Sequence, residues 1–264
     1  MNEWRLHGDA PYRIAAIHGG PGACGEMRPL AEECSRHTGV LETLHTKPSI
    51  QGQINELTRA VEAAGRPPMT LIGHSWGAWL SVIYAAKHPY HVAKLILIAS
   101  APFAPEYAEN VGAIRLSRMS DDEREEFIQL ERVMDDHEAA GKNDAFRRLA
   151  QLIGKADTYE FFDDAQAAIS GIDYRVDVFQ SVWPEARRVR QTGQLLEYLM
   201  RVACPIVAIH GDYDPHPAAG VRNTLNALPI TFRFVLLTKC GHAPWRERHA
   251  RDQFYRILRE ELAP

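Results

Sequence analysis

The sequence lacks the features that mark several large classes of protein. No hydrophobic run approaches the roughly 18 consecutive apolar residues that suggest a membrane-spanning helix. Basic residues do not dominate either, because 30 Lys and Arg stand against 34 Asp and Glu and give a formal net charge of −4. Non-specific electrostatic binding of DNA or RNA needs a surface on which basic residues are clustered. We therefore expect neither a membrane protein nor a nucleic-acid-binding one.

Cysteine is also scarce. The four cysteines (Cys24, Cys34, Cys204 and Cys240) form no C-x-x-C pair and no zinc-ligand spacing. No apolar segment follows a basic one near Met1, so a secretory signal is not expected. The sequence therefore predicts a cytoplasmic protein with reduced thiols, no bound metal and no cofactor.

What is present favours one large α/β domain. The 264 residues are 45% hydrophobic and 24% charged, close to the averages for soluble globular proteins. Short apolar runs with strand character alternate with helical stripes, which is typical of a parallel sheet with crossover helices. The expected strands are 12–17, 40–44, 69–72, 92–99, 206–209 and 232–237, and the expected helices include 50–61, 76–88 and 250–262.

This alternation stops between residues 101 and 200. The segment opens with prolines and then turns helical, and Ser120-Asp121-Asp122-Glu123 is a capping-box pattern that predicts a helix start. Acidic residues outnumber basic ones here, whereas the reverse holds in the rest of the chain. We therefore expect a core formed by 1–100 and 201–264, interrupted by a helical cap at 101–200.

The strongest chemical signal is Gly73-His74-Ser75-Trp76-Gly77, a G-x-S-x-G motif between a predicted strand and a predicted helix. A serine on such a tight turn is held in strained backbone geometry, and small flanking residues let the turn close. Its hydroxyl is exposed next to a helix N-terminus, which favours developing negative charge. The motif predicts Ser75 as a nucleophile.

A nucleophilic serine needs a base and an orienting acid. Both are available in the chain order serine, acid, histidine that suits this architecture. His242 follows the last predicted strand, and we prefer it to His210, at a strand end, and to His216, in a proline-flanked turn. Two carboxylates follow the preceding strand, and we favour Asp214 over Asp212 because it lies farther along the loop.

A second motif, His18-Gly19-Gly20-Pro21-Gly22, directly follows the first predicted core strand. Acyl transfer develops a negative oxygen, and two main-chain N–H groups must already face it. Glycines let the main chain approach a substrate closely. We assign the two donors of this oxyanion hole to the N–H groups of Gly20 and Trp76, and we expect His18 to hold the loop rather than carry a proton.

These motifs resemble the α/β-hydrolase superfamily, and H-G-G-P-G with G-H-S-W-G is similar to its proline iminopeptidase branch. The resemblance implies a serine hydrolase with Ser75, Asp214 and His242 as its triad. It also implies that a helical cap covers the pocket and that cap carboxylates bind the amino terminus of a peptide. The chain departs from that branch in lacking an arginine-glycine loop near Gly39 and in leaving little room for a leading hairpin before Tyr12.

Acidic residues gather with aromatic ones in the expected cap. Negative potential attracts a cationic amino group, but acidic runs on helices are most often solvated faces, so both interpretations stay open. The cluster consists of Asp157, Tyr159, Glu160, Phe161, Phe162, Asp163 and Asp164.

The sequence thus predicts a hydrolase that cleaves an ester or an amide of a small molecule or short peptide through an acyl-enzyme. Aminopeptidase, carboxylesterase, lactonase, lyase and carbon–carbon hydrolase activities all suit the same residues. A non-enzymatic receptor is disfavoured by the complete set of Ser75, Asp214 and His242. Dehalogenases and epoxide hydrolases need a carboxylate where Ser75 stands and are excluded. The oligomeric state is left open.

Overall fold

The computed structural model describes residues 3–136, 138–162 and 171–263. At its centre is a seven-stranded sheet in the order β1-β4-β2-β5-β6-β8-β9. All neighbouring strands are parallel except β1 and β4. This confirms the predicted α/β fold with a mostly parallel sheet. The strands are β1 (Trp4–His7), β2 (Tyr12–Ile17), β4 (Gly39–Thr43), β5 (Gly65–His74), β6 (Val92–Ile98), β8 (Ile206–Gly211) and β9 (Phe232–Leu237).

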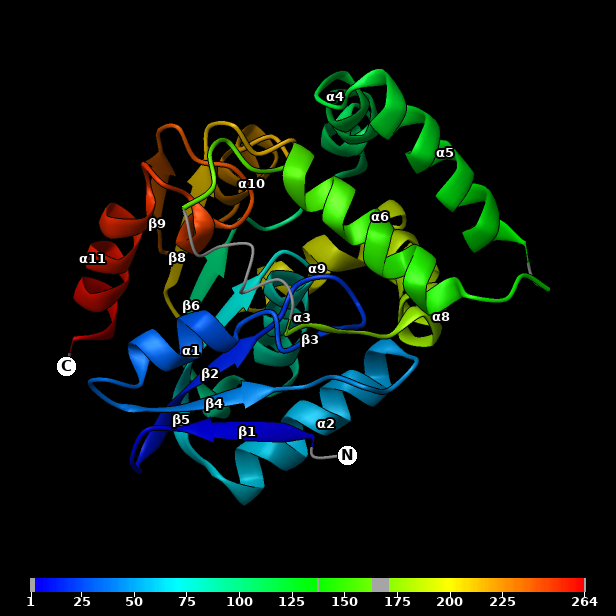
Figure 1. Cartoon of the computed structure of the whole chain (residues 1–264). Helices are drawn as coiled ribbons and strands as arrows, with labels where there is room; N and C mark the ends of the chain where they lie inside the picture. The colour runs from blue at the N-terminus through cyan, green and yellow to red at the C-terminus, as the bar shows by residue number, and fades with distance from the viewer. Residues whose placement is uncertain (1–2, 137, 163–170, 264) are drawn as a thin grey trace.

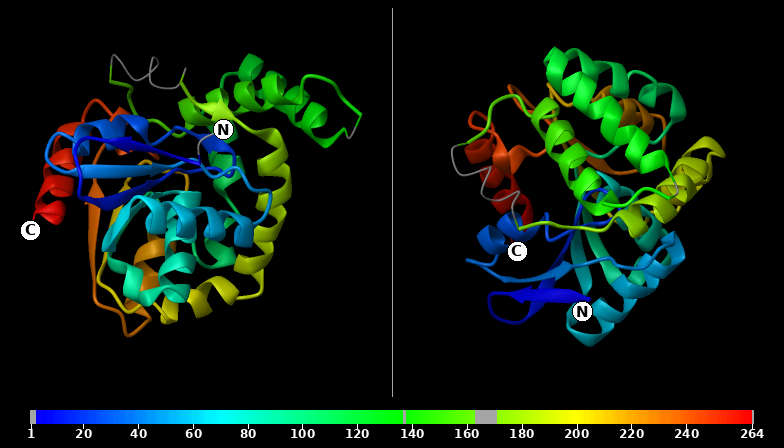
Figure 2. Two further views of the ribbon diagram at one scale, coloured as in Figure 1. Left: turned by 90° about the horizontal axis from the view of Figure 1, so that it is seen from below. Right: turned by 45° about the vertical axis from the view of Figure 1, so that its right-hand side comes forward.

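Helices cover both faces of the sheet (Figures 1 and 2). Successive residues of each central strand point to opposite faces. Leu71 of β5 therefore packs in one apolar cluster and Ile72 in the other. The cluster around Ile72 contains side chains of α1 (Arg28–Cys34) and α11 (Arg251–Leu262). Helices that contribute to the cluster around Leu71 are α2 (Ile50–Ala63), α3 (Trp76–Lys87), α8 (Val176–Gln191), α9 (Gln194–Met200) and α10 (Ala219–Asn226).

The segment between β6 and β8 is mostly helical. Its first part holds α4 (Val111–Ser117), α5 (Asp121–Asp135) and α6 (Lys142–Ala156), which form a layer beside the sheet domain in Figure 1. The predicted capping box starts α5, because the Glu123 N–H donates to Ser120 Oγ at 3.2 Å and the Ser120 N–H donates to Glu123 Oε2 at 3.0 Å. By contrast, α8 and α9 pack into the apolar cluster around Leu71, against the sheet.

Short elements connect this segment with the sheet domain. The strands β3 (Ala23–Cys24) and β7 (Asp173–Tyr174) form a separate antiparallel pair. Single turns of 3₁₀-helix lie at Pro89–His91, Pro105–Ala108 and Pro244–Arg246. None of the helices in the described part of the chain is long and apolar enough to cross a lipid bilayer.

The first strand was not found by the sequence analysis, which noted only that little room is left for a leading hairpin before Tyr12. Residues Trp4 to His7 form β1, which pairs antiparallel with β4 from Trp4↔Thr43 to His7↔Val40. It is a single edge strand and does not pair with β2. Its two middle residues are exposed, so the strand lacks the apolar run by which a buried strand is found in a sequence.

Candidate active site

Ser75 occupies a sharp turn between β5 and α3. Its φ of 51° and ψ of −113° lie outside the conformations that a residue with a side chain normally adopts. Close packing forces this turn. A Cβ on Gly73 would lie 2.3 Å from the Gly77 carbonyl oxygen, and one on Gly77 would lie 2.2 Å from the Ile17 carbonyl oxygen. The Ser75 N–H donates to the Ile98 carbonyl at 3.0 Å. The turn thus has the geometry that the motif predicts.

The structure brings His242 together with Asp214 and not with Asp212. His242 Nδ1 lies 2.8 Å from Asp214 Oδ2, and Asp214 is buried. Asp212 is exposed, and its Oδ1 accepts a hydrogen bond from the Cys240 N–H at 3.3 Å. The imidazole Nδ1–H therefore donates to Asp214, which leaves Nε2 as the ring nitrogen that can accept a proton.

This pairing sets the protonation of both groups. Burial lowers the pKa of His242, but the ionised Asp214 carboxylate outweighs burial and holds that pKa above its ordinary value. Burial also raises the pKa of Asp214, but His242 and His216 together hold it well below its usual range. Asp214 is therefore ionised at neutral pH and stabilises a protonated His242.

Two further histidines surround Asp214, and the sequence analysis gave them no role here. The His216 main-chain N–H donates to Asp214 Oδ1 at 2.9 Å, and His216 Nδ1 lies 3.2 Å from the same oxygen. His210 Nε2 lies 2.8 Å from the His216 carbonyl oxygen and 3.4 Å from Asp214 Oδ2. Burial lowers the pKa of His216 to about 4, so this ring is neutral at neutral pH.

The same cluster contains a set of groups that could hold a metal ion. One ligand atom from each of Asp214, His216 and His242 lies within 4.8 Å of the others, and two imidazoles with one carboxylate suit a transition metal. All three side chains are already hydrogen-bonded inside the cluster. The arrangement therefore suits an acid–base pair without a metal.

The main chain of His242 is held from two sides. Its N–H donates to the Asp157 carbonyl at 2.9 Å, and its carbonyl oxygen lies 2.9 Å from His74 Nε2. The rings of His74 and His242 are 4.7 Å apart. Because Ser75 directly follows His74, the histidine loop lies against the nucleophile turn. A Cβ on Gly241 would lie 1.9 Å from the Asp157 carbonyl oxygen, so this approach requires glycine.

The glycine loop after β2 lies beside the serine. A Cβ on Gly19 would lie 3.2 Å from the Ser75 Cβ. The His45 N–H donates to His18 Nε2 at 3.2 Å, so the Nδ1–H of His18 donates to the Gly19 carbonyl at 2.8 Å. Burial lowers the pKa of His18, which is therefore neutral and holds the loop as expected. Gly20 has a φ of +37°.

The two N–H groups predicted for the oxyanion hole are available for a ligand. Trp76 is the first residue of α3, where a main-chain N–H has no intrahelical acceptor. No residue in the described part of the chain accepts a hydrogen bond from the N–H of Gly20 or Trp76. The Trp76 ring is buried, and its Nε1–H donates to Gln53 Oε1 at 3.0 Å.

The two acidic residues of the cluster that the structure describes, Asp157 and Glu160, are paired with cations. Asp157 accepts two hydrogen bonds from Arg115, at 2.8 and 2.6 Å. Glu160 lies 2.7 Å from Arg248 Nε and 2.9 Å from His249 Nε2. These two carboxylates are therefore not free for a substrate amine. The other two acidic residues of the cluster, Asp163 and Asp164, lie outside the described residues.

Glu247 joins the inserted segment to the histidine loop, a role that the sequence analysis did not find. Its buried carboxylate accepts three main-chain hydrogen bonds, from Gly241 at 2.7 Å and from Tyr159 and Glu160 at 3.0 Å each. A carboxylate with three N–H donors is strongly held. The loop that carries His242 is thereby fixed to residues 159–160.

A groove of about 620 Å³ lies elsewhere, between α1 and α11. Thr70 and Lys94, from the early parts of β5 and β6, contribute to its wall. It contains none of the predicted site residues, which lie past the carboxyl ends of the strands, where sites on parallel sheets form.

Comparison with known proteins establishes the family. A family model described as "alpha/beta hydrolase fold" matches residues 21–244. The chain therefore belongs to the α/β-hydrolase family.

Individual relatives are distant. A monoacylglycerol lipase (abhd6-B) of Xenopus laevis is 23% identical over 222 residues, which cover 80% of this chain and 61% of the lipase. This chain thus spans less than two thirds of that relative. A 2-hydroxy-6-oxo-2,4-heptadienoate hydrolase of Pseudomonas putida is 23% identical over 95% of this chain and 88% of its own length. The solved structure of an esterase from Exiguobacterium antarcticum has the same fold, with a TM-score of 0.70 and 14% identity over 99% of this chain and 95% of the esterase.

Proposed function

We propose that this protein is a serine hydrolase that cleaves a carboxylic ester of a small molecule through an acyl-enzyme. The observation that carries the proposal is the 2.8 Å contact between Asp214 and His242, on a loop that lies against the strained turn of Ser75. A hydroxyl, an imidazole and a buried carboxylate in this order perform acyl transfer in unrelated folds.

In the proposed mechanism, His242 takes the Ser75 proton as the serine oxygen attacks the ester carbonyl. Asp214 orients the imidazole and stabilises its charged form. The carbonyl oxygen becomes negative and is stabilised by the N–H groups of Gly20 and Trp76. His242 then protonates the leaving alcohol, which departs and leaves Ser75 acylated. Water repeats the sequence and releases the acid.

Within the inserted segment 101–200, the part that carries α4 to α6 and residues 157–160 is proposed to act as a cap over this site, whereas α8 and α9 pack against the sheet domain. The hydrogen bond from the His242 N–H to the Asp157 carbonyl supports the proposal. The hydrogen bonds that the Glu247 carboxylate accepts from the N–H groups of residues 159 and 160 support it as well. Substrate is then expected to enter between this segment and the carboxyl ends of the strands.

An ester substrate is favoured over a peptide bound by its free amino terminus, the substrate that the motif resemblance implies. An aminopeptidase of that kind needs carboxylates that are free to bind an amine, and Arg115 and Arg248 already engage Asp157 and Glu160. A second candidate is hydrolysis of a 2-hydroxy-6-oxo-dienoate, the class of compound in the name of the Pseudomonas putida relative. The similarity over 95% of this chain favours testing it.

A substrate panel tests the proposal. Purified wild type and Ser75→Ala would be assayed with p-nitrophenyl esters of two to twelve acyl carbons, a homoserine lactone, prolyl-naphthylamide and a 2-hydroxy-6-oxo-dienoate. We expect ester turnover by wild type that the alanine variant lacks. Cleavage of prolyl-naphthylamide alone would assign the peptidase function instead. Turnover of the dienoate without ester turnover would assign the second candidate.

A further inference from the structure

A second carboxylate–imidazole pair lies directly beside the first. Glu26 Oε2 is 3.0 Å from His74 Nδ1 and also accepts a hydrogen bond from the Gly19 N–H at 2.7 Å. The other ring nitrogen of His74, Nε2, is 2.9 Å from the His242 carbonyl oxygen. The His74 side chain is 1% exposed and that of Glu26 is 13% exposed. Two residues thus contact three loops of the proposed site.

The partners of His74 determine its protonation. A carbonyl oxygen only accepts hydrogen bonds, so Nε2 of His74 carries a proton toward His242. An ionised carboxylate also only accepts, so Nδ1 carries a proton toward Glu26. Burial raises the pKa of Glu26, but His74, Arg246 and the Gly19 N–H outweigh burial and hold that pKa below its ordinary value.

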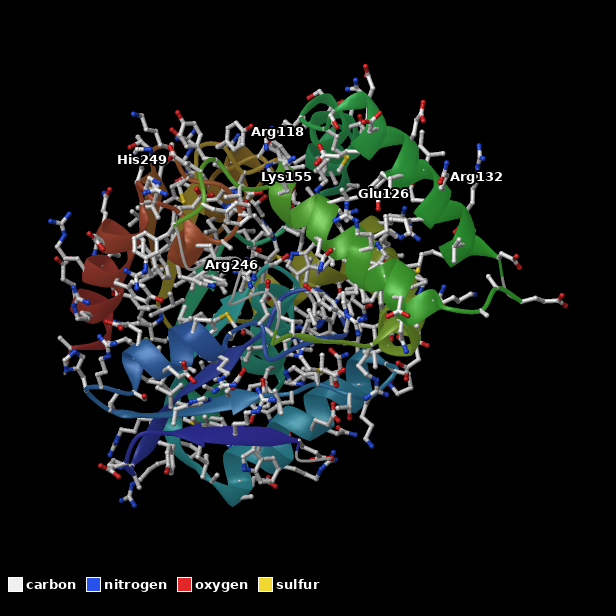
Figure 3. The ribbon with its side chains drawn as sticks, in the orientation of Figure 1. Arg118, Glu126, Arg132, Lys155, Arg246 and His249 are labelled. Atoms are coloured by element: carbon white, nitrogen blue, oxygen red, sulfur yellow. The ribbon has the colours of Figure 1, made fainter. Side chains whose placement is uncertain are left out.

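Arg246 adds a second buried cation near this pair. It is 8% exposed, and its Nε and Nη2 have no hydrogen-bond partner among the residues that the structure describes. In Figure 3 it lies near the middle of the molecule, above α1, whereas Arg132 projects from α5. Its positive charge is among the influences that keep Glu26 ionised. Glu26 is therefore an ionised carboxylate near a buried arginine.

We propose that Glu26 and His74 are a positioning pair that holds the oxyanion loop, the nucleophile turn and the loop of the catalytic histidine in register. This inference rests on the proposed function and adds two residues to it, neither of which touches the reacting atoms. Glu26 fixes the Gly19 N–H, in the peptide directly before the one that carries the Gly20 N–H. His74 fixes the carbonyl of His242 and directly precedes Ser75. The packing is tight, because a Cβ on Gly19 would lie 2.7 Å from both Glu26 Oε2 and His74 Nδ1.

Kinetics of Glu26 variants test the role in positioning. With a p-nitrophenyl ester, Glu26→Ala should lower kcat on the order of 10²-fold and change KM less than about threefold. A misplacement of the catalytic groups by about 1 Å lowers kcat by this factor, whereas binding of the ester is unchanged. Glu26→Gln should recover about tenfold of this loss, since its amide oxygen still accepts from Gly19. Glu32→Ala is the matched control, because Glu32 is an exposed carboxylate of α1, six residues after Glu26, that pairs with Arg28. It should leave kcat unchanged.

The protonation of His74 is measured without any substrate. Nitrogen-15 NMR of the imidazole groups at pH 7.5 should show one buried ring with both nitrogens protonated, and this signal should vanish in His74→Gln. A wild-type kcat in Glu26→Ala, or a His74 ring in wild type that carries a proton on only one nitrogen, would overturn the proposal. If wild type cleaves no ester and Ser75 resists a fluorophosphonate, the proposed function fails, while the NMR result still decides whether the hydrogen-bonded pair exists.

Discussion

Replacement of Arg115 by methionine tests the link between the inserted segment and the proposed catalytic base. Arg115 holds the Asp157 carboxylate through two hydrogen bonds of 2.8 and 2.6 Å. The carbonyl of Asp157 accepts the His242 N–H at 2.9 Å. Methionine keeps much of the aliphatic stem and removes the guanidinium, so the Asp157 carboxylate stays buried without its cation.

The expected loss of stability follows from the burial of the pair. Removal of one member of a buried ion pair costs roughly 3–5 kcal/mol, because the remaining charge is desolvated and unpaired. Asp157 is 4% exposed but the Arg115 side chain is 20% exposed. We therefore expect the lower end, about 3 kcal/mol of the free energy of unfolding.

The same variant should change the pH dependence of catalysis. Asp157 raises the pKa of His242 and Arg115 lowers it. Arg115→Met removes the lowering influence, so the pKa of His242 rises further. Since His242 must be neutral to accept the Ser75 proton, the acid limb of kcat/KM should move to higher pH.

Urea unfolding and a pH–rate profile measure the two effects, and Arg148→Met supplies the control. Arg148 makes an equally good pair with Glu126, at 2.7 Å for each hydrogen bond, but the two side chains are 45% and 38% exposed. In Figure 3 Glu126 lies on the outer helices, away from Arg246. This control should lose at most about 1 kcal/mol and keep the wild-type profile. The reasoning is refuted if Arg115→Met unfolds within about 0.5 kcal/mol of wild type, or if its acid limb stays in place or moves down.

Three further predictions follow from the site. Because Asp214 raises the pKa of His242 above 6.5, wild-type kcat/KM should fall to half its plateau at a pH above 6.5, with loss of activity as the pH falls; a midpoint below 6 would contradict this assignment. Asp214→Asn should lower kcat on the order of 10⁴-fold, whereas Asp212→Asn should stay within a few-fold, and equal losses would show that the wrong carboxylate was chosen. Thiol titration of the folded protein should modify at most Cys204, which is only partly buried. The other three thiols (Cys24, Cys34 and Cys240) are buried, and burial also raises their pKa, to about 12 for Cys24 and Cys34. All four thiols should react in urea. Rapid reaction of a second thiol in the folded protein would contradict the burial of these three cysteines.

The central strands were predictable because they are buried on both faces. The central strand β2 was found with its bounds intact, since a strand covered by helices on both sides has a short apolar run bounded by turn residues. The bounds of β9 were found as well, although it lies at the edge of the sheet and is mostly only partly buried. The nucleophile turn was also predictable, because close packing at Gly73 and Gly77 leaves a trace in the sequence. The edge strand β1 was not, because half of it faces solvent.

Pairings between distant residues could not be predicted in the same way. Glu26 and His74 are 48 positions apart and Arg115 and Asp157 are 42 apart, and nothing in the local pattern around any of them indicates its partner. The acidic cluster of the inserted segment shows the consequence. From sequence alone its carboxylates suit an amine or a solvated face, and only the fold reveals the arginines that hold two of them. A motif predicts the geometry of its own turn, whereas the role of a charged residue cannot be predicted until its neighbours in the fold are known.

The most direct test of the proposed chemistry is the reaction of Ser75 with a fluorophosphonate, followed by intact mass and peptide mapping. We predict one covalent adduct per chain, located on Ser75, that forms slowly in His242→Ala and is absent in Ser75→Ala. An unlabelled wild-type protein, or an adduct that persists in Ser75→Ala, would contradict the assignment of this serine as the nucleophile.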